Sequence, residues 1–182
     1  KMFSGCFSLK EINIPSSVTL IDYEAFRECS SLTSFIIPPS VTSIHLGTFN
    51  GCISLINITI PPSVTLIEYG AFDGCKALKN VTIPPSVTSI GRYAFNECSS
   101  LKEISIPPSV IDIFDYAFAN CTSLTKISIP SYFVPLFPSI LEGCTSLLQI
   151  EIPNTVKNIS QGVFEGCSSL KQITIPSSVQ KI

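Results

Sequence analysis

Hydrophobic and polar positions alternate along this chain in a pattern that returns every 23 residues. Cysteine marks it most clearly, because all eight cysteines are separated by intervals of 23 residues. Apolar residues follow each cysteine at three, six and eight residues, from Cys6, Leu9, Ile12 and Ile14 to Cys167, Leu170, Ile173 and Ile175. No insertion or deletion interrupts the period. It indicates an array of small repeats, since each unit can bury its apolar side chains only against its neighbours.

Three local patterns predict the elements of each repeat. The segment L-x-x-I-x-I alternates apolar and polar residues and ends at proline, as a strand with one buried face does. The segment V-T-x-I, after a P-x-S turn, predicts a second, weaker strand on the opposite wall. In A-F-x-x-C, spacings of three and four residues predict a single helical turn that points Ala25, Phe26 and Cys29 inward.

These elements together predict one α/β solenoid over residues 1–182. It has about eight coils, with short parallel strands on the concave face and the second strands and helical turns on the other side. Parallel strands lie about 4.8 Å apart, so the body is on the order of 40 Å long.

Composition and charge narrow the classes of partner. A hydrophobic content of 45% with 13% charged residues excludes a disordered chain, and no apolar run reaches the ~20 residues that cross a bilayer. With 11 basic and 13 acidic residues the formal charge is -2, which gives no excess positive potential for nucleic acid or an anionic membrane. We therefore predict neither nucleic-acid binding nor membrane insertion by this segment.

The consensus resembles the BspA-like class of leucine-rich repeats, which joins L-x-x-I-x-I-P to V-x-x-I and then to A-F-x-x-C. The resemblance covers the whole chain, and residues 83–98, IPPSVTSIGRYAFNEC, follow the pattern almost residue for residue. It implies a secreted or cell-surface protein that adheres to host cells and extracellular proteins. It supplies no catalytic residues.

The eight cysteines could form disulfides or hold a metal. With one cysteine per coil, neighbouring Cα atoms lie about 5 Å apart, within disulfide range, but stacked side chains point the same way instead of toward each other. We predict free thiols that pack as small hydrophobic groups. Zinc is disfavoured because such a row lacks tetrahedral convergence and C-x-x-C is absent. No cofactor is predicted.

Catalysis is not predicted either. His45 is the only histidine, and it stands at a variable position where other repeats have Asp22, Glu68 or Gly91. The many serines fit turns and caps, and the carboxylates do not recur in one column.

The positions predicted to bind a partner are the two strand columns that must point away from the core. Their residues vary while the core columns do not, and on a curved solenoid they line the concave face. The alternative is a solvated sheet that only avoids aggregation. The sixteen residues are Glu11, Asn13, Ser34, Ile36, Asn57, Thr59, Asn80, Thr82, Glu103, Ser105, Lys126, Ser128, Gln149, Glu151, Gln172 and Thr174.

A second candidate surface is apolar. Phe114 and Phe137 share a variable column in adjacent repeats, and Tyr132 stands nearby in the divergent repeat of residues 130–152. Clustered exposed apolar side chains often mark an interaction site. The alternative is that this repeat folds its aromatic residues into its own core.

Two further features concern modification and assembly. Four N-x-S/T sequons occur, at Asn57, Asn80, Asn120 and Asn158, and glycans on the first two would obstruct the concave face. Neither end has an atypical capping repeat, which predicts a fragment of a longer array or ends that pack against another molecule, including end-to-end self-association.

The function predicted from these features is a cell-surface or secreted adhesion module that recognises a host protein or glycan through the concave face. The alternative is a structural spacer or scaffold within a larger protein.

Overall fold

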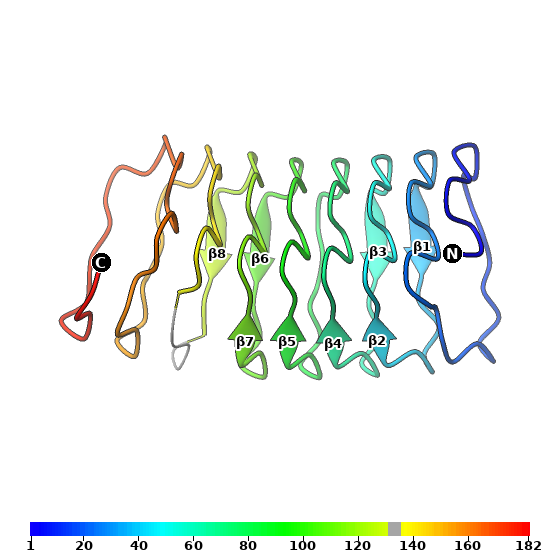
Figure 1. The fold of residues 1–182 in the computed structure, drawn as a ribbon, viewed down its shortest axis with the longest axis horizontal. Helices are drawn as coiled ribbons and strands as arrows, with labels where there is room; N and C mark the ends of the chain where they lie inside the picture. The colour runs from blue at the N-terminus through cyan, green and yellow to red at the C-terminus, as the bar shows by residue number, and fades with distance from the viewer. Residues whose placement is uncertain (131–135) are drawn as a thin grey trace.

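The computed structural model describes residues 1–130 and 136–182, and it shows a β-solenoid. The coils lie side by side in one row, with the two termini at opposite ends (Figure 1). Tyr132, which belongs to the predicted apolar patch, lies outside the described residues. The predicted solenoid with parallel strands is confirmed.

One wall of the solenoid, called the strand wall below, carries the three-residue strands. In each strand the middle residue is buried and its two neighbours are exposed, as the alternating sequence requires. Parallel pairing joins β1 to β3 and β6 to β8, and an isolated bridge joins Asn57 to Asn80. The strands are β1 (Ser34–Ile36), β3 (Asn57–Thr59), β6 (Glu103–Ser105) and β8 (Lys126–Ser128).

The V-T-x-I segments form a second parallel sheet of four two-residue strands, in the order β2-β4-β5-β7. The second residue of each strand is an isoleucine that points into the core. The predicted second, weaker strand is therefore present. These strands are β2 (Ser43–Ile44), β4 (Leu66–Ile67), β5 (Ser89–Ile90) and β7 (Asp112–Ile113).

The coil count differs from the eight predicted. Among the described residues, regular strands define about four turns on each side, and other repeats contribute isolated bridges such as Leu136 with Ile159 and Glu151 with Thr174. Strands of two or three residues make so few ladder hydrogen bonds that a small shift leaves a bridge in place of a strand.

The predicted helical turn is wrong, because the described residues contain no helix. Glu24 and Glu28 have positive φ angles of 51° and 59°, and a left-handed residue every fourth position cannot continue a right-handed helix. Instead, successive backbone amides donate hydrogen bonds in turn to a carbonyl of the same coil and to a carbonyl of the next coil. Ala25 N–H donates to the Asp22 carbonyl, and Phe26 N–H donates to the Thr48 carbonyl. The inward direction of Ala25, Phe26 and Cys29 is nevertheless as predicted, since all three are buried.

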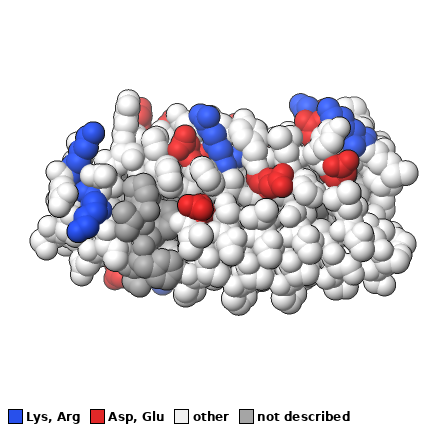
Figure 2. All heavy atoms as spheres, turned by 60° about the horizontal axis from the view of Figure 1, so that its bottom comes forward, with Lys and Arg blue, Asp and Glu red and all other residues white. Residues whose placement is uncertain are grey.

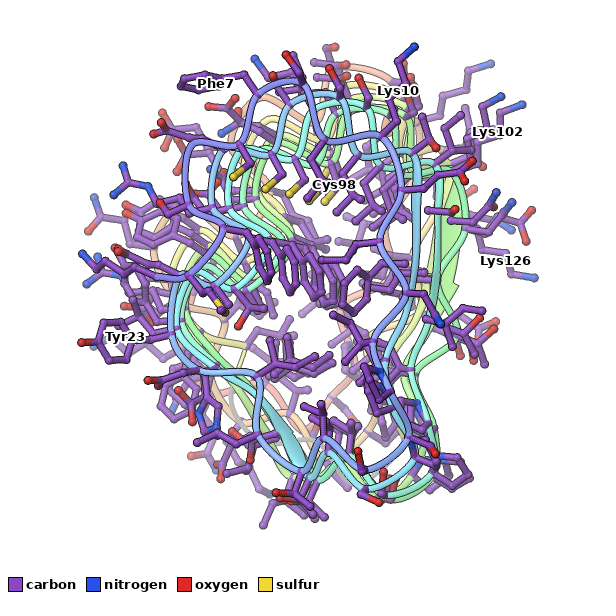
Figure 3. All side chains as sticks on the ribbon, turned by 90° about the vertical axis from the view of Figure 1, so that its right-hand side faces the viewer. Phe7, Lys10, Tyr23, Cys98, Lys102 and Lys126 are labelled. Atoms are coloured by element: carbon purple, nitrogen blue, oxygen red, sulfur yellow. The ribbon has the colours of Figure 1, made fainter. Side chains whose placement is uncertain are left out.

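The core consists of like side chains stacked from coil to coil. Phenylalanine rings form a nearly parallel stack from Phe3 to Phe118, with centroids 5.1 to 5.7 Å apart. The sulfur atoms run in single file beside them, as the row that contains Cys98 shows (Figure 3). This arrangement is the repeating core that the 23-residue period predicts.

All eight cysteines are free. Each thiol from Cys29 to Cys167 lies within hydrogen-bonding distance of the carbonyl 26 residues earlier, and the Cys52 Sγ atom donates to the Phe26 carbonyl at 3.1 Å. Burial raises the pKa of the Cys52 and Cys144 thiols to about 12, and it holds the pKa of the Cys75, Cys98 and Cys121 thiols well above the usual range. The thiols stay protonated and pack as apolar groups with a weak donor.

Candidate functional site

The strand wall places all sixteen predicted binding residues at the surface. Each of them is exposed, while the residue between the two columns, such as Phe35 or Ile58, is buried except in the first and last repeats, where Ile12 and Ile173 are partly buried. Where β1 pairs with β3 and β6 pairs with β8, the parallel ladders use the amides and carbonyls of the wall. A partner on this wall would therefore meet side chains.

The strand wall is hollowed at its C-terminal end. A hollow of about 780 Å³ is lined by Lys126 and Ser128 of β8 and by residues of the two following repeats. Polar side chains dominate its lining, with one exposed leucine, Leu148. The polar lining residues from the predicted columns are Lys126, Ser128, Gln149, Glu151, Gln172 and Thr174.

A second hollow of about 430 Å³ adjoins the first. Its lining combines β6 and β8 with residues 80–82, and Lys126 and Ser128 belong to both hollows. Carboxylate, ammonium, amide and hydroxyl groups all occur in it, from Glu103, Lys126, Asn80 and Ser105. The structure thus brings ten of the sixteen predicted residues together around two adjoining depressions.

The opposite wall carries an aromatic cluster that sequence reasoning missed. The rings of Tyr93 and Tyr116 stack with centroids 4.9 Å apart, and Tyr69 meets Tyr93 edge to face at 5.6 Å. The Arg92 guanidinium lies 5.1 and 5.5 Å from the Tyr93 and Tyr116 ring centroids. Figure 3 shows that Tyr23, on this wall, points away from Lys126 on the strand wall. The available signal was that Tyr93 and Tyr116 are 23 residues apart.

Tyr93 and Tyr116 also adopt positive φ angles of 58° and 57° at the column where other repeats have Gly47, Gly70 and Gly162. A bulky residue is strained in this backbone region, at a cost of order 1–3 kcal/mol. The ring stack and the guanidinium above it supply local contacts that offset this strain.

Two residues of the predicted apolar patch, Phe114 and Phe137, lie in the described part of the chain. The rings of Phe114 and Phe137 lie 5.8 Å apart, with Phe114 42% exposed and Phe137 partly buried against the core. The ring of Phe114 is thus partly open to solvent while the ring of Phe137 packs against the core, and the interaction patch stays a prediction.

The four sequon asparagines are all exposed. Asn57 and Asn80 lie side by side on the strand wall. The Asn120 amide donates to the Asn96 side chain at 3.2 Å.

His45 pairs with a carboxylate instead of a nucleophile. Its Nδ1 atom lies 3.0 Å from Glu68 Oε1, and Glu68 Oε2 accepts the Leu46 amide. In the part of the chain that the structure describes, no group of three or more histidine, cysteine or acidic side chains could hold a metal ion. Within the same residues, no helix combines the length and the apolarity needed to cross a membrane.

Each repeat of this parallel-strand solenoid contributes a leucine, isoleucines and a cysteine to the core. These features define the leucine-rich repeat class. The model of the BspA type leucine rich repeat region matches residues 1–99 and 65–182, so the chain belongs to that family. A search of curated proteins finds no match to this chain.

Solved structures support the same assignment. A leucine-rich repeat protein from Bacteroides ovatus is 37% identical with a TM-score of 0.88 over 92% of this chain, and this chain spans 46% of its length. The T. pallidum leucine rich repeat protein is 34% identical with a TM-score of 0.75, covering 81% of this chain and 69% of its own. A leucine rich cell surface protein from Faecalibacterium prausnitzii is 33% identical with a TM-score of 0.55, covering 99% of this chain and 63% of its own.

Proposed function

We propose that this solenoid is a cell-surface or secreted adhesion module that recognises a host protein or glycan through the strand wall. The observation that carries the proposal is the pair of adjoining hollows on that wall, lined by residues from the two variable columns. Repeat solenoids generally bind through such extended surfaces. The F. prausnitzii neighbour, described as a cell surface protein, supports a surface location.

The test is a screen of host matrix proteins and glycans with two forms of the chain. The first is the wild type, and the second reverses the charges of Glu11, Glu103, Lys126 and Glu151. We expect at least one ligand to bind the wild type and to lose tenfold or more of its affinity for the reversed form. A control form that reverses Lys76 and Glu97, an ion pair outside the strand wall, should keep full affinity.

The competing proposal is a spacer or scaffold, and the same screen separates the two. Ligand binding that survives all four strand-wall reversals would contradict recognition through this wall. Absence of any ligand in the screen would favour the spacer.

A further inference from the structure

The charged side chains of the strand wall form no ion pairs within the described residues. Ion pairs hold Arg27, Lys76 and Arg92 outside this wall. In the described residues none of the strand-wall charges forms an ion pair; they are Lys10, Glu11, Lys79, Lys102, Glu103, Lys126, Glu151 and Lys171. Even Glu103 and Lys126, which are direct register partners, stay apart. These charges are available to a partner.

The two hollows adjoin across successive coils, and together they are called the trough below. Lys126 and Ser128 line both, so the trough extends from Asn80 to Gln172 along the solenoid axis. Its charged lining residues alternate in sign from coil to coil: Glu103, Lys126, Glu151 and Lys171. Figure 3 shows Lys126 extending outward from this wall.

Alternating signs select the chemical class of the ligand. An acidic glycan carries only negative groups and would meet Glu103 and Glu151 as well as the two lysines. A polypeptide can present ammonium and carboxylate groups in turn and complement all four. Complementary charges of this kind fix the register of a partner and exclude wrong ones.

The spacing of the trough selects the conformation of that polypeptide. Coils repeat about every 4.8 Å along the axis, and one turn of an α-helix rises about 5.4 Å. Residues three or four apart on a helix can therefore face successive coils. Same-face residues of an extended strand lie roughly 6.7 Å apart and do not match. Where β6 pairs with β8, the backbone groups of the wall are already used by the ladder and do not serve an added strand.

The width of the trough agrees with its spacing. Relative to the leucine of each repeat, Lys171 stands one residue along the strand and Glu151 stands four along, a lateral distance of about 10 Å at ~3.3 Å per residue. An α-helix with its side chains is about 10–12 Å across.

We propose that the trough binds an α-helical segment of a partner protein whose exposed face alternates basic and acidic side chains at intervals of three or four residues. This inference rests on the proposed function and specifies its ligand.

The experiment uses two synthetic helical peptides of identical composition, stapled on the face away from the charges. In the first, lysine and glutamate alternate every three or four residues; in the second, the lysines occupy one half and the glutamates the other. We expect the alternating peptide to bind at least tenfold more tightly, with an affinity that falls as salt rises.

Two protein variants make the test specific. Exchange of the two register partners, Glu103→Lys with Lys126→Glu, breaks the alternation without changing net charge and should abolish the tenfold preference. The matched exchange Lys76→Glu with Glu97→Lys should preserve it. Thermal unfolding of each variant verifies the fold.

Three results would overturn the inference: equal binding of the two peptides, undetectable binding of both, or a preference that survives the Glu103–Lys126 exchange. Binding of a heparin oligosaccharide in preference to the alternating peptide would also overturn it and would indicate an acidic glycan. If a matrix protein binds through the strand wall while the two peptides bind equally, the helical ligand is wrong and the proposed function stands.

Discussion

The strand wall and the opposite wall enclose the same core, yet they use their polar groups in opposite ways. Across the solenoid from the unpaired charges of the strand wall, Arg92 lies over two stacked tyrosines and near Asp115, and Asp73 accepts hydrogen bonds from Asn50 and Asn96. These side chains of the opposite wall thus contact one another, whereas the charged side chains of the strand wall form no ion pairs within the described residues. One hydrophobic core thus carries a wall with side chains that contact one another and a wall whose charged side chains form no ion pairs.

The largest expected effect comes from the thiols that lie beneath both walls. Burial raises the pKa of each of the five innermost thiols, and in the unfolded chain they ionise near ~8.5. Their contribution to stability is therefore complete below about pH 8.5 and is lost as pH rises toward the folded pKa. Above about pH 9 the free energy of unfolding should fall by roughly 1.4 kcal/mol per thiol per pH unit, or about 7 kcal/mol per unit for five.

Urea denaturation under reducing conditions, followed by far-ultraviolet circular dichroism from pH 7 to 10.5, measures this slope. Cys75→Ala should reduce it by about one fifth. If the free energy of unfolding did not fall between pH 8 and 10.5, the thiols would ionise in the folded state as readily as in the unfolded chain.

Inward and outward positions should differ sharply in stability. Phe72 is fully buried between Phe49 and Phe95, so Phe72→Ala leaves a cavity and should cost about 3–5 kcal/mol. Thr59→Ala, on the exposed column of the strand wall, should change stability by less than about 0.5 kcal/mol. Chemical denaturation of both variants checks the contrast, which fails if the two costs are similar.

A smaller effect distinguishes the opposite wall. A Cβ atom on Gly91 would lie 2.6 Å from the Glu68 carbonyl carbon and 2.7 Å from the Tyr69 nitrogen. Because these are backbone atoms, the coils must separate, and Gly91→Ala should cost about 1–3 kcal/mol. Ser89→Ala on the neighbouring strand is the control. Amide hydrogen exchange should become faster around residues 68–70 and stay unchanged in β6 and β8. A uniform increase across the array would contradict the prediction that the two walls respond independently.

The smallest effect concerns Asp73. Burial raises its pKa despite two amide donors. A raised pKa means that the carboxyl group supports folding best when protonated and that this support is lost as pH rises through the folded pKa. Asp73→Asn should therefore leave stability at pH 7 unchanged or higher by under ~1 kcal/mol, and should flatten the pH dependence of stability above about pH 4, the ordinary pKa of an aspartate. Glu103→Gln is the strand-wall control, and a loss above about 1 kcal/mol would mean that the two hydrogen bonds outweigh desolvation.

The sequence predicted the features that repeat. Every core column, the strand alternation and the exposure of the sixteen outer residues follow from side-chain type at a fixed period, because burial decides them coil by coil. It also led to the correct family through the residues of L-x-x-I-x-I-P and A-F-x-x-C.

The features it missed depend on backbone torsion or on contacts between unlike columns. In A-F-x-x-C the spacing fits a helical turn, but glutamate and tyrosine hold left-handed conformations that residue type does not reveal. The stacking of Arg92 on Tyr116 joins two different columns of the repeat, so no single column of the sequence reveals it. The proposal for the trough depends on which charged side chains form ion pairs, and the sequence does not show that. Fewer repeats than expected form regular strands, because in such short segments one hydrogen bond decides between a strand and an isolated bridge.

The invariant 23-residue period has a consequence for how such surfaces can change over time. Since most coils meet their neighbours through the same types of buried side chain, duplicating or deleting one regular repeat preserves the pattern of interior contacts. Such an event lengthens or shortens the row of outer residues by about 4.8 Å and shifts the order of its charges. Recombination between repeats could thus generate new surfaces in single steps, without intermediates that fail to fold.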